Sequence, residues 1–153
     1  IRLGTARLTH CMRWLGLSKR CLEEASAYVA HRMSFGQTLA AHEGVQWMLG
    51  DVAKDIQIGR LLTMQAAWKL DQGDFARSDI SIAKIHAADT LHKAADTAIQ
   101  LLGARGYSKD TIVEWIYRYA RQARLVDGAS EIHKMVLSRA YLSEGQDFFR
   151  WGV

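Results

Sequence analysis

Apolar residues recur along this chain at intervals of three and four positions, the spacing that gathers side chains on one face of a helix. In the first such stretch, residues 5–31, the apolar stripe consists of Leu8, Met12, Leu15, Leu22, Ala25 and Val29. In the second, residues 39–70, it consists of Val45, Met48, Leu49, Val52, Ile56 and Leu62. The pattern predicts two long helices separated by a loop at 32–38.

The second half of the chain predicts one more long helix and two shorter ones. The long helix covers 79–102, and its inward positions are small, which lets neighbouring helices approach closely: Ala83, Ala87, Ala94, Ala95 and Ala98. Asp110 is suited to cap a helix over 110–121, and Ser130 to open another over 130–144. Because the chain has no proline and short connections, we expect an all-α, up-and-down four-helix bundle with an additional short helix.

Length and composition favour one compact unit. The 153 residues, 49% of them hydrophobic, are enough for a single domain over 1–153 and too few for two ordinary ones. The net charge of +4 comes from basic residues scattered among 16 acidic ones, without the sustained basic block of a nucleic-acid-binding arm. The aromatic tail, with Phe148, Phe149 and Trp151, is expected to pack against this chain or a partner.

The sequence also bears on the cellular setting. It has no run of 18 apolar residues and no apolar segment of a signal peptide, so we expect neither membrane insertion nor secretion. Cys11 and Cys21 lie about 15 Å apart along one predicted helix, which prevents a disulfide between them and fits a reducing compartment. We therefore expect a cytoplasmic protein, or one of the mitochondrial or peroxisomal matrix in a eukaryote. The start at Ile1 suggests a piece of a longer polypeptide.

A single acid, Asp127, follows a basic helical run and precedes Gly128 and the start of the last predicted helix. A carboxylate on such a loop is held by backbone rather than by a mobile side chain. That suits a general base, which must lie within hydrogen-bond reach of the proton it removes. The alternative is a structural role, with Asp127 capping the helix beside a turn glycine.

Two other loops carry candidate binding groups. Arg32, Ser34 and Phe35 offer a guanidinium, a hydroxyl and an aromatic ring, which suit a nucleotide-bearing cofactor. Equally, Arg32 could cap the preceding helix and Phe35 could fill the core. Gly103 and Gly106 could expose backbone N–H groups or merely end a helix.

Three motifs occur in a recognisable order. They are R-x-x-F-G-x-x-L at 32–39, Q-x-x-G-x-x-G-Y at 100–107, and R-x-A-R at 118–121 followed by D-G-A-S-E-I at 127–132. Over nearly the whole chain, these motifs resemble the C-terminal helical domain of acyl-CoA dehydrogenases. The resemblance implies the C-terminal part of a flavoenzyme that binds FAD, forms a homo-oligomer (dimer or tetramer), and passes electrons to electron-transfer flavoprotein or another acceptor.

The resemblance also implies roles for individual residues. It places the catalytic base at Asp127, which removes the α-proton of an acyl-CoA thioester during α,β-dehydrogenation. It places the acyl-CoA substrate at Arg7 and Gly128. It also implies residues that contact FAD, some of them the flavin of a neighbouring subunit: Arg32, Ser34, Phe35, His42, Glu43, Gln100, Gly103, Ala129 and Glu131.

The chain departs from the usual family pattern at two places. Asp127 stands where Glu is usual, so its carboxylate is one methylene shorter. Branches of the family that have Asp-Gly here also carry His-x-Met-Arg near the start, as in residues 10–13 of this chain. Ala104 and Ala129 stand where Gly and Thr are common, and Ala129 lacks the hydroxyl expected near the flavin.

Other functional classes fit less well. A di-iron bundle needs Glu-x-x-His pairs, whereas Glu131 and His133 are two residues apart, so no metal site is predicted. The basic, aromatic helix around Arg121 forms no single stripe that could track phosphates, so no nucleic-acid partner is predicted. The alternative that stays open is a non-catalytic helical module for oligomerisation or interaction.

Overall fold

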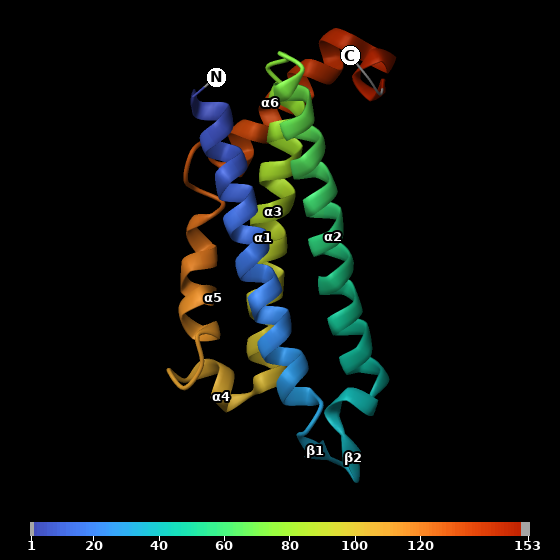
Figure 1. Ribbon diagram of the computed structural model, residues 1–153, viewed down its shortest axis with the longest axis vertical. Coiled ribbons are helices and arrows are strands. Elements are labelled where there is room, and N and C mark those ends of the chain that lie inside the picture. The colour runs from blue at the N-terminus through green and yellow to red at the C-terminus, as the bar shows by residue number, and fades with distance from the viewer. Residues whose placement is uncertain (1, 151–153) are drawn as a thin grey trace.

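Three long antiparallel helices form the body of the molecule (Figure 1). The computed structural model describes residues 2–150. Helix α1 (Arg2–Val29) leads to a two-stranded antiparallel hairpin, β1 (Met33–Ser34) and β2 (Gln37–Thr38), and a 3₁₀ turn, η1 (Leu39–Ala41). Helix α2 (Glu43–Asp71) returns along α1, and α3 (Arg77–Leu102) runs back between them.

The shorter helices complete the bundle. After the single turn α4 (Ala104–Tyr107), α5 (Val113–Gln122) packs beside α3 and α1 as the fourth member. Helix α6 (Ser130–Glu144) packs against α3 at the end of the bundle that holds the start of α1, and η2 (Gly145–Phe149) follows it (Figure 1). The predicted all-α four-helix bundle with additional short helices is confirmed.

The core follows the small-residue seam of α3. All five alanines predicted to face inward are buried. They meet buried residues from α1 and α5, among them Trp14, Val29 and Ile116, so the long helices approach closely around α3. Cys11 and Cys21 are free, buried thiols, and burial raises the pKa of each to about 12.

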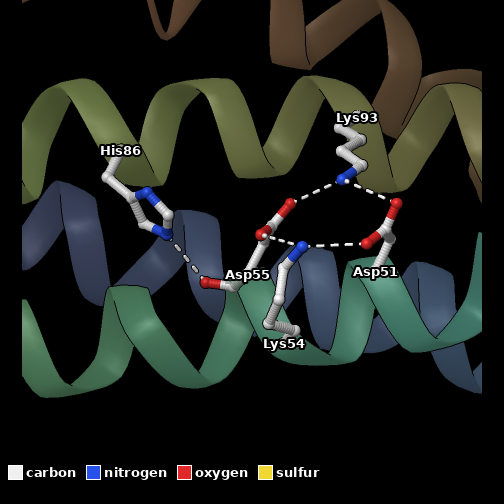
Figure 2. A network of polar contacts seen from close by, with 5 residues as sticks. All are labelled: Asp51, Lys54, Asp55, His86 and Lys93. Carbon is white, nitrogen blue, oxygen red and sulfur yellow. Dashed lines mark hydrogen bonds and ion pairs between the residues drawn. The ribbon is translucent and has the colours of Figure 1, made fainter.

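Polar contacts tie α2 to α3 at the surface (Figure 2). Lys93 of α3 bonds the Asp55 carboxylate at 2.7 Å and approaches Asp51 at 3.7 Å, while Lys54 bonds Asp51 at 2.8 Å. His86 of α3 contacts the backbone carbonyl of Asp55 at 2.8 Å. The hydrogen bond from Lys54 is the main cause that lowers the pKa of Asp51. These contacts fix the register of α2 against α3.

Several local predictions are wrong. The second helix begins at Glu43 rather than residue 39, because the preceding segment forms the hairpin and η1. Met12 is 64% exposed, and its neighbour Cys11 is buried instead. Asp110 caps no helix: its carboxylate accepts a hydrogen bond from Ser108, and α5 begins at Val113.

The aromatic tail is covered only in part within this chain, since Phe148 is half-buried and Phe149 is 64% exposed. Phe148 and Phe149 contact Tyr141 at the end of α6, with ring centroids 5.9 and 5.8 Å from its ring. Trp151 lies outside the described residues. Within residues 2–150, no helix is both long and apolar enough to span a membrane.

Candidate functional site

The loop between α5 and α6 makes a sharp turn at Asp127 and Gly128. Both residues have positive φ, 51° and 98°, a region that Gly adopts freely and Asp tolerates better than most residues. A Cβ at Gly128 would lie 3.1 Å from Nε2 of His133 and 3.4 Å from the Arg7 guanidinium. The absence of a side chain at Gly128 therefore lets both groups approach the turn.

Three side chains from two helices hold this turn. Arg7 of α1 donates from Nε to the Asp127 carbonyl at 2.9 Å. Lys84 of α3 donates from Nζ to the Gly128 carbonyl. His10 of α1 lies with Nε2 2.8 Å from Oδ2 of Asp127. The backbone and the carboxylate of Asp127 are thus fixed independently of each other.

Buried polar groups surround the back of the turn. Lys84 is fully buried, 5.7 Å from the centre of the Trp14 ring, and burial lowers its pKa, with the Arg7 charge acting in the same direction. His133 is buried and lies 3.0 Å from the Ser81 hydroxyl through Nδ1. Burial lowers the pKa of His133 as well, and the charges of Lys84 and Arg7 add to this effect.

The Asp127 side chain does not cap α6. The N-cap position of α6 is Ala129, and no side-chain cap hydrogen bond is present there. The carboxylate is one-third exposed and paired with His10. A fixed, partly exposed carboxylate at a strained turn is an arrangement that can accept a proton from a bound substrate.

The hairpin at the opposite end of the bundle presents the second group of candidates. Phe35, with φ of 50°, stands at the tip of the hairpin and is 96% exposed, so it does not fill the core. His42 supports the hairpin: its ring nitrogens lie 3.1 Å from the Ser34 carbonyl and 3.1 Å from the Gln37 amide. An exposed aromatic ring on a braced hairpin is free to contact a molecule outside this chain.

A cavity of about 440 Å³ lies between the ends of α1 and α3. Arg32 lines it together with Leu102 and Arg105, which flank Gly103 on either side, so the first two motifs converge here. Glu24 also lines the cavity but is paired with Arg20 at 2.6 Å. Within residues 2–150, neither the Arg32 nor the Arg105 side chain has a hydrogen bond or an ion pair. Two guanidiniums in one cavity suit an anionic diphosphate.

The remaining candidates divide between the two ends of the bundle. Gln100 is exposed on the last turn of α3, near Gly103, and Glu43 is exposed in the first turn of α2. Ala129 and Glu131 follow the Asp127 turn, with Glu131 exposed in the first turn of α6. The two ends are far apart, since Val29 lies 22 positions after Arg7 in α1, which corresponds to about 33 Å along the helix.

Three residues around Asp127 were not singled out as its neighbours by the sequence. Lys84 could have been predicted to be buried, because it lies four residues after Ile80 and three before Ala87, on the buried seam of α3. For His10 the only signal was the His-x-Met-Arg motif that accompanies Asp-Gly, which does not show a contact between the two residues. For His133 there was no signal, since its contact with the turn depends on the packing of α6.

Known proteins share this sequence and this arrangement of helices. Residues 2–142 match the family model described as acyl-CoA dehydrogenase, C-terminal domain. This chain belongs to the acyl-CoA dehydrogenase family. It is 37% identical to the Mycobacterium tuberculosis protein FadE2 over 154 aligned positions, covering 99% of this chain and 38% of FadE2.

Solved structures agree with the sequence comparison. A glutaryl-CoA dehydrogenase in complex with glutaryl-CoA matches with a TM-score of 0.88 and 31% identity, over 99% of this chain and 38% of that one. Butyryl-CoA dehydrogenase from Megasphaera elsdenii matches with a TM-score of 0.87 and 30% identity, over 92% and 37%. This acyl-CoA dehydrogenase domain thus spans less than two-fifths of the length of these relatives.

Proposed function

We propose that this domain is the C-terminal part of an FAD-dependent acyl-CoA dehydrogenase, with Asp127 as its catalytic base. The observation that carries the proposal is the Asp127 carboxylate, fixed at a turn of positive φ by contacts from α1 and α3 while one-third of it stays exposed. In the proposed reaction the α C–H bond of an acyl thioester breaks, and its proton bonds to an Asp127 oxygen.

Bound FAD would supply the oxidant, accepting the hydride that leaves the β-carbon, so that a trans-2-enoyl thioester forms. Arg7 and Gly128 would flank the acyl-CoA beside Asp127, with Arg7 also fixing the turn through the Asp127 carbonyl. Closure of this site by the rest of the protein would exclude water, which strengthens the electrostatic interactions among these groups.

Residues at the far end of the bundle would hold FAD that is bound mainly by another subunit. Arg32 would bind its diphosphate in the cavity shared with Arg105, and Phe35 would present its exposed ring. Ser34, His42, Glu43, Gln100 and Gly103 would complete this surface, whereas Ala129 and Glu131 would lie near the flavin at the Asp127 end. About 33 Å separates the two ends, so one subunit would contact two cofactors.

The homo-oligomer that this requires has a matching surface on α2. Its outward face carries large apolar side chains that are 40–65% exposed: Ile58, Leu61, Met64 and Trp68. Helical spacing of three and four residues makes them neighbours on one face. We propose that this face is covered in a dimer or tetramer. The partner that takes up the electrons of the reaction would be electron-transfer flavoprotein or a similar acceptor.

Replacing the base tests the proposed reaction. In the full-length protein carrying this domain, Asp127→Asn keeps the shape of the side chain but removes its basic carboxylate. Flavin reduction by acyl-CoA, followed by absorbance in a stopped-flow instrument, should slow by roughly 100-fold or more while bound FAD is retained. Asp127→Glu should keep activity. Unchanged flavin reduction in the Asn variant would exclude Asp127 as the base.

A further inference from the structure

His10 makes the one side-chain contact to the Asp127 carboxylate that the structure gives within residues 2–150. The two residues come from distant parts of the chain, α1 and the loop before α6, and Nε2 lies 2.8 Å from Oδ2. Arg7 and Lys84 bond backbone carbonyls of the turn instead. His10 is therefore the side chain that orients the Asp127 carboxylate.

The environment of the ring indicates which nitrogen carries the proton. Nδ1 of His10 is buried and has no hydrogen-bond partner in the described part of the chain. A proton on Nδ1 would leave a buried donor unsatisfied, which is unfavourable. A neutral ring with its proton on Nε2 avoids this cost, because Nε2–H donates to Oδ2 and Nδ1 keeps a lone pair.

The His10 ring is also held in place. It stacks on the buried Trp14 with ring centroids 5.3 Å apart and an angle of 22° between the planes. A fixed ring presents its N–H in one direction. Since that donor engages Oδ2, it defines the plane of the Asp127 carboxylate and leaves Oδ1 without a protein side chain bonded to it among residues 2–150.

We propose that His10 is a positioning residue for the catalytic base: it donates Nε2–H to Oδ2 of Asp127 and so directs Oδ1 toward the α-proton of the substrate. This inference rests on the proposed function of Asp127. Positioning matters here because an error of about 1 Å at a reacting group can slow a reaction 100-fold.

Six ionisable side chains from the described helices surround the Asp127 turn. From α1 these are Arg7, His10 and Cys11, from α3 Lys84, and from α6 Glu131 and His133. Among the groups of this set, His10 alone is bonded to the carboxylate itself. Replacing it therefore changes the hydrogen bonding of the base while the other charged groups around the turn stay in place.

The test uses the full-length, FAD-loaded protein and the saturated acyl-CoA, among butyryl-, octanoyl- and palmitoyl-CoA, that reduces it fastest. His10→Phe keeps a ring to stack on Trp14 but removes the donor, whereas His10→Gln keeps an N–H donor. His92→Phe is the matched control, because His92 also packs against an aromatic ring, Tyr117, with ring centroids 5.6 Å apart, away from the turn. Two rates are measured: flavin reduction, and exchange of the α-proton for deuterium from solvent.

We expect His10→Phe to slow both rates by roughly 10- to 100-fold. The loss should appear in the limiting rate at saturating acyl-CoA, because a misplaced base slows the chemical step itself. FAD content and acyl-CoA affinity should not change. His10→Gln should recover part of the rate, and His92→Phe should behave like the unsubstituted protein.

Two results would overturn the inference. One is a His10→Phe variant with unchanged rates. The other is a slowed Phe variant whose rates are not improved in His10→Gln, since loss of the N–H donor would then not be the cause. If the Phe variant does not fold, His10→Gln is compared with the unsubstituted protein: rates within roughly tenfold of normal support the inference, and a larger loss with FAD content and acyl-CoA affinity intact rejects it. Failure of the proposed function is separate, because it appears as full activity in Asp127→Asn.

Discussion

Lys84, Ser81 and His133 are buried polar residues that connect the core of the bundle to the Asp127 turn. Lys84 reaches the Gly128 carbonyl, and His133 lies against Gly128 while contacting Ser81 through its other nitrogen. Desolvation of such groups opposes folding unless their hydrogen bonds compensate. The contacts of Lys84 and His133 therefore hold the turn against the core and offset the cost of burying these groups.

Burial of His133 should make the protein sensitive to mild acid. The pKa of His133 is lowered in the folded state. Near and below the ordinary value of about 6.5, the unfolded chain therefore binds more protons than the folded one, and stability decreases as the pH is lowered. His133→Gln should therefore flatten the decline in Tm between pH 7 and pH 5.5, measured by thermal unfolding. His31→Gln, at an exposed position, is the control and should leave the slope unchanged. An equal decline in all three proteins would contradict this.

At the scale of elements, the contact of α1, α2 and α3 depends on a glycine. A Cβ at Gly59 of α2 would lie 2.6 Å from Leu15 of α1 and 3.2 Å from His86 of α3. Both distances are too short for ordinary packing, and Leu15 is itself buried in a dense core. The three helices can meet at this level because the position has no side chain.

Gly59→Val should destabilise the protein by about 1–3 kcal/mol, the usual cost of overpacking a core. Gly50→Val is the matched control, since Gly50 lies in the same helix with no atom within 4 Å of an added Cβ. That change should alter stability by less than about 1 kcal/mol, in the stabilising direction, because Val is a better helix former than Gly. Urea unfolding of both variants measures the difference, and equal effects would rule out the close approach.

The elements also mark how far the sequence could predict this structure. Periodicity was sufficient for α3, where the five alanines predicted to face inward are all buried. It failed at Met12, because α1 carries apolar residues on more than one face and periodicity alone does not choose among them. The hairpin was missed because a turn through Phe35 and Gly36 lacks the usual Asn-Gly signal. Asp127 could be predicted from its loop. The motif at residues 10–13 indicated His10 only through its co-occurrence with Asp-Gly, because the contact itself forms only when α1 packs against that loop.

At the scale of the whole molecule, the candidate residues occupy opposite ends of a helical bundle. The Asp127 turn lies near the start of α1, and the hairpin with Arg32 lies beyond its last turn (Figure 1). Helices α1, α2 and α3 all run between these ends and share one core, so the separation is fixed by their length. In the proposed oligomer, each active site would combine the base of one subunit with the hairpin of another.

This separation has a genetic consequence. Two inactive alleles, Asp127→Asn and Arg32→Ala, should complement each other when co-expressed, because a mixed dimer pairs both defects in one active site and leaves the other with no defect. Differently tagged subunits, purified through both tags, should recover about half of the acyl-CoA-dependent flavin reduction per flavin site, while each homo-oligomer stays inactive. Co-expression of Asp127→Asn with His10→Phe, whose defects lie at the same end, should yield no such site. Lack of recovery in the first pair would mean that each subunit supplies both ends to its own cofactor.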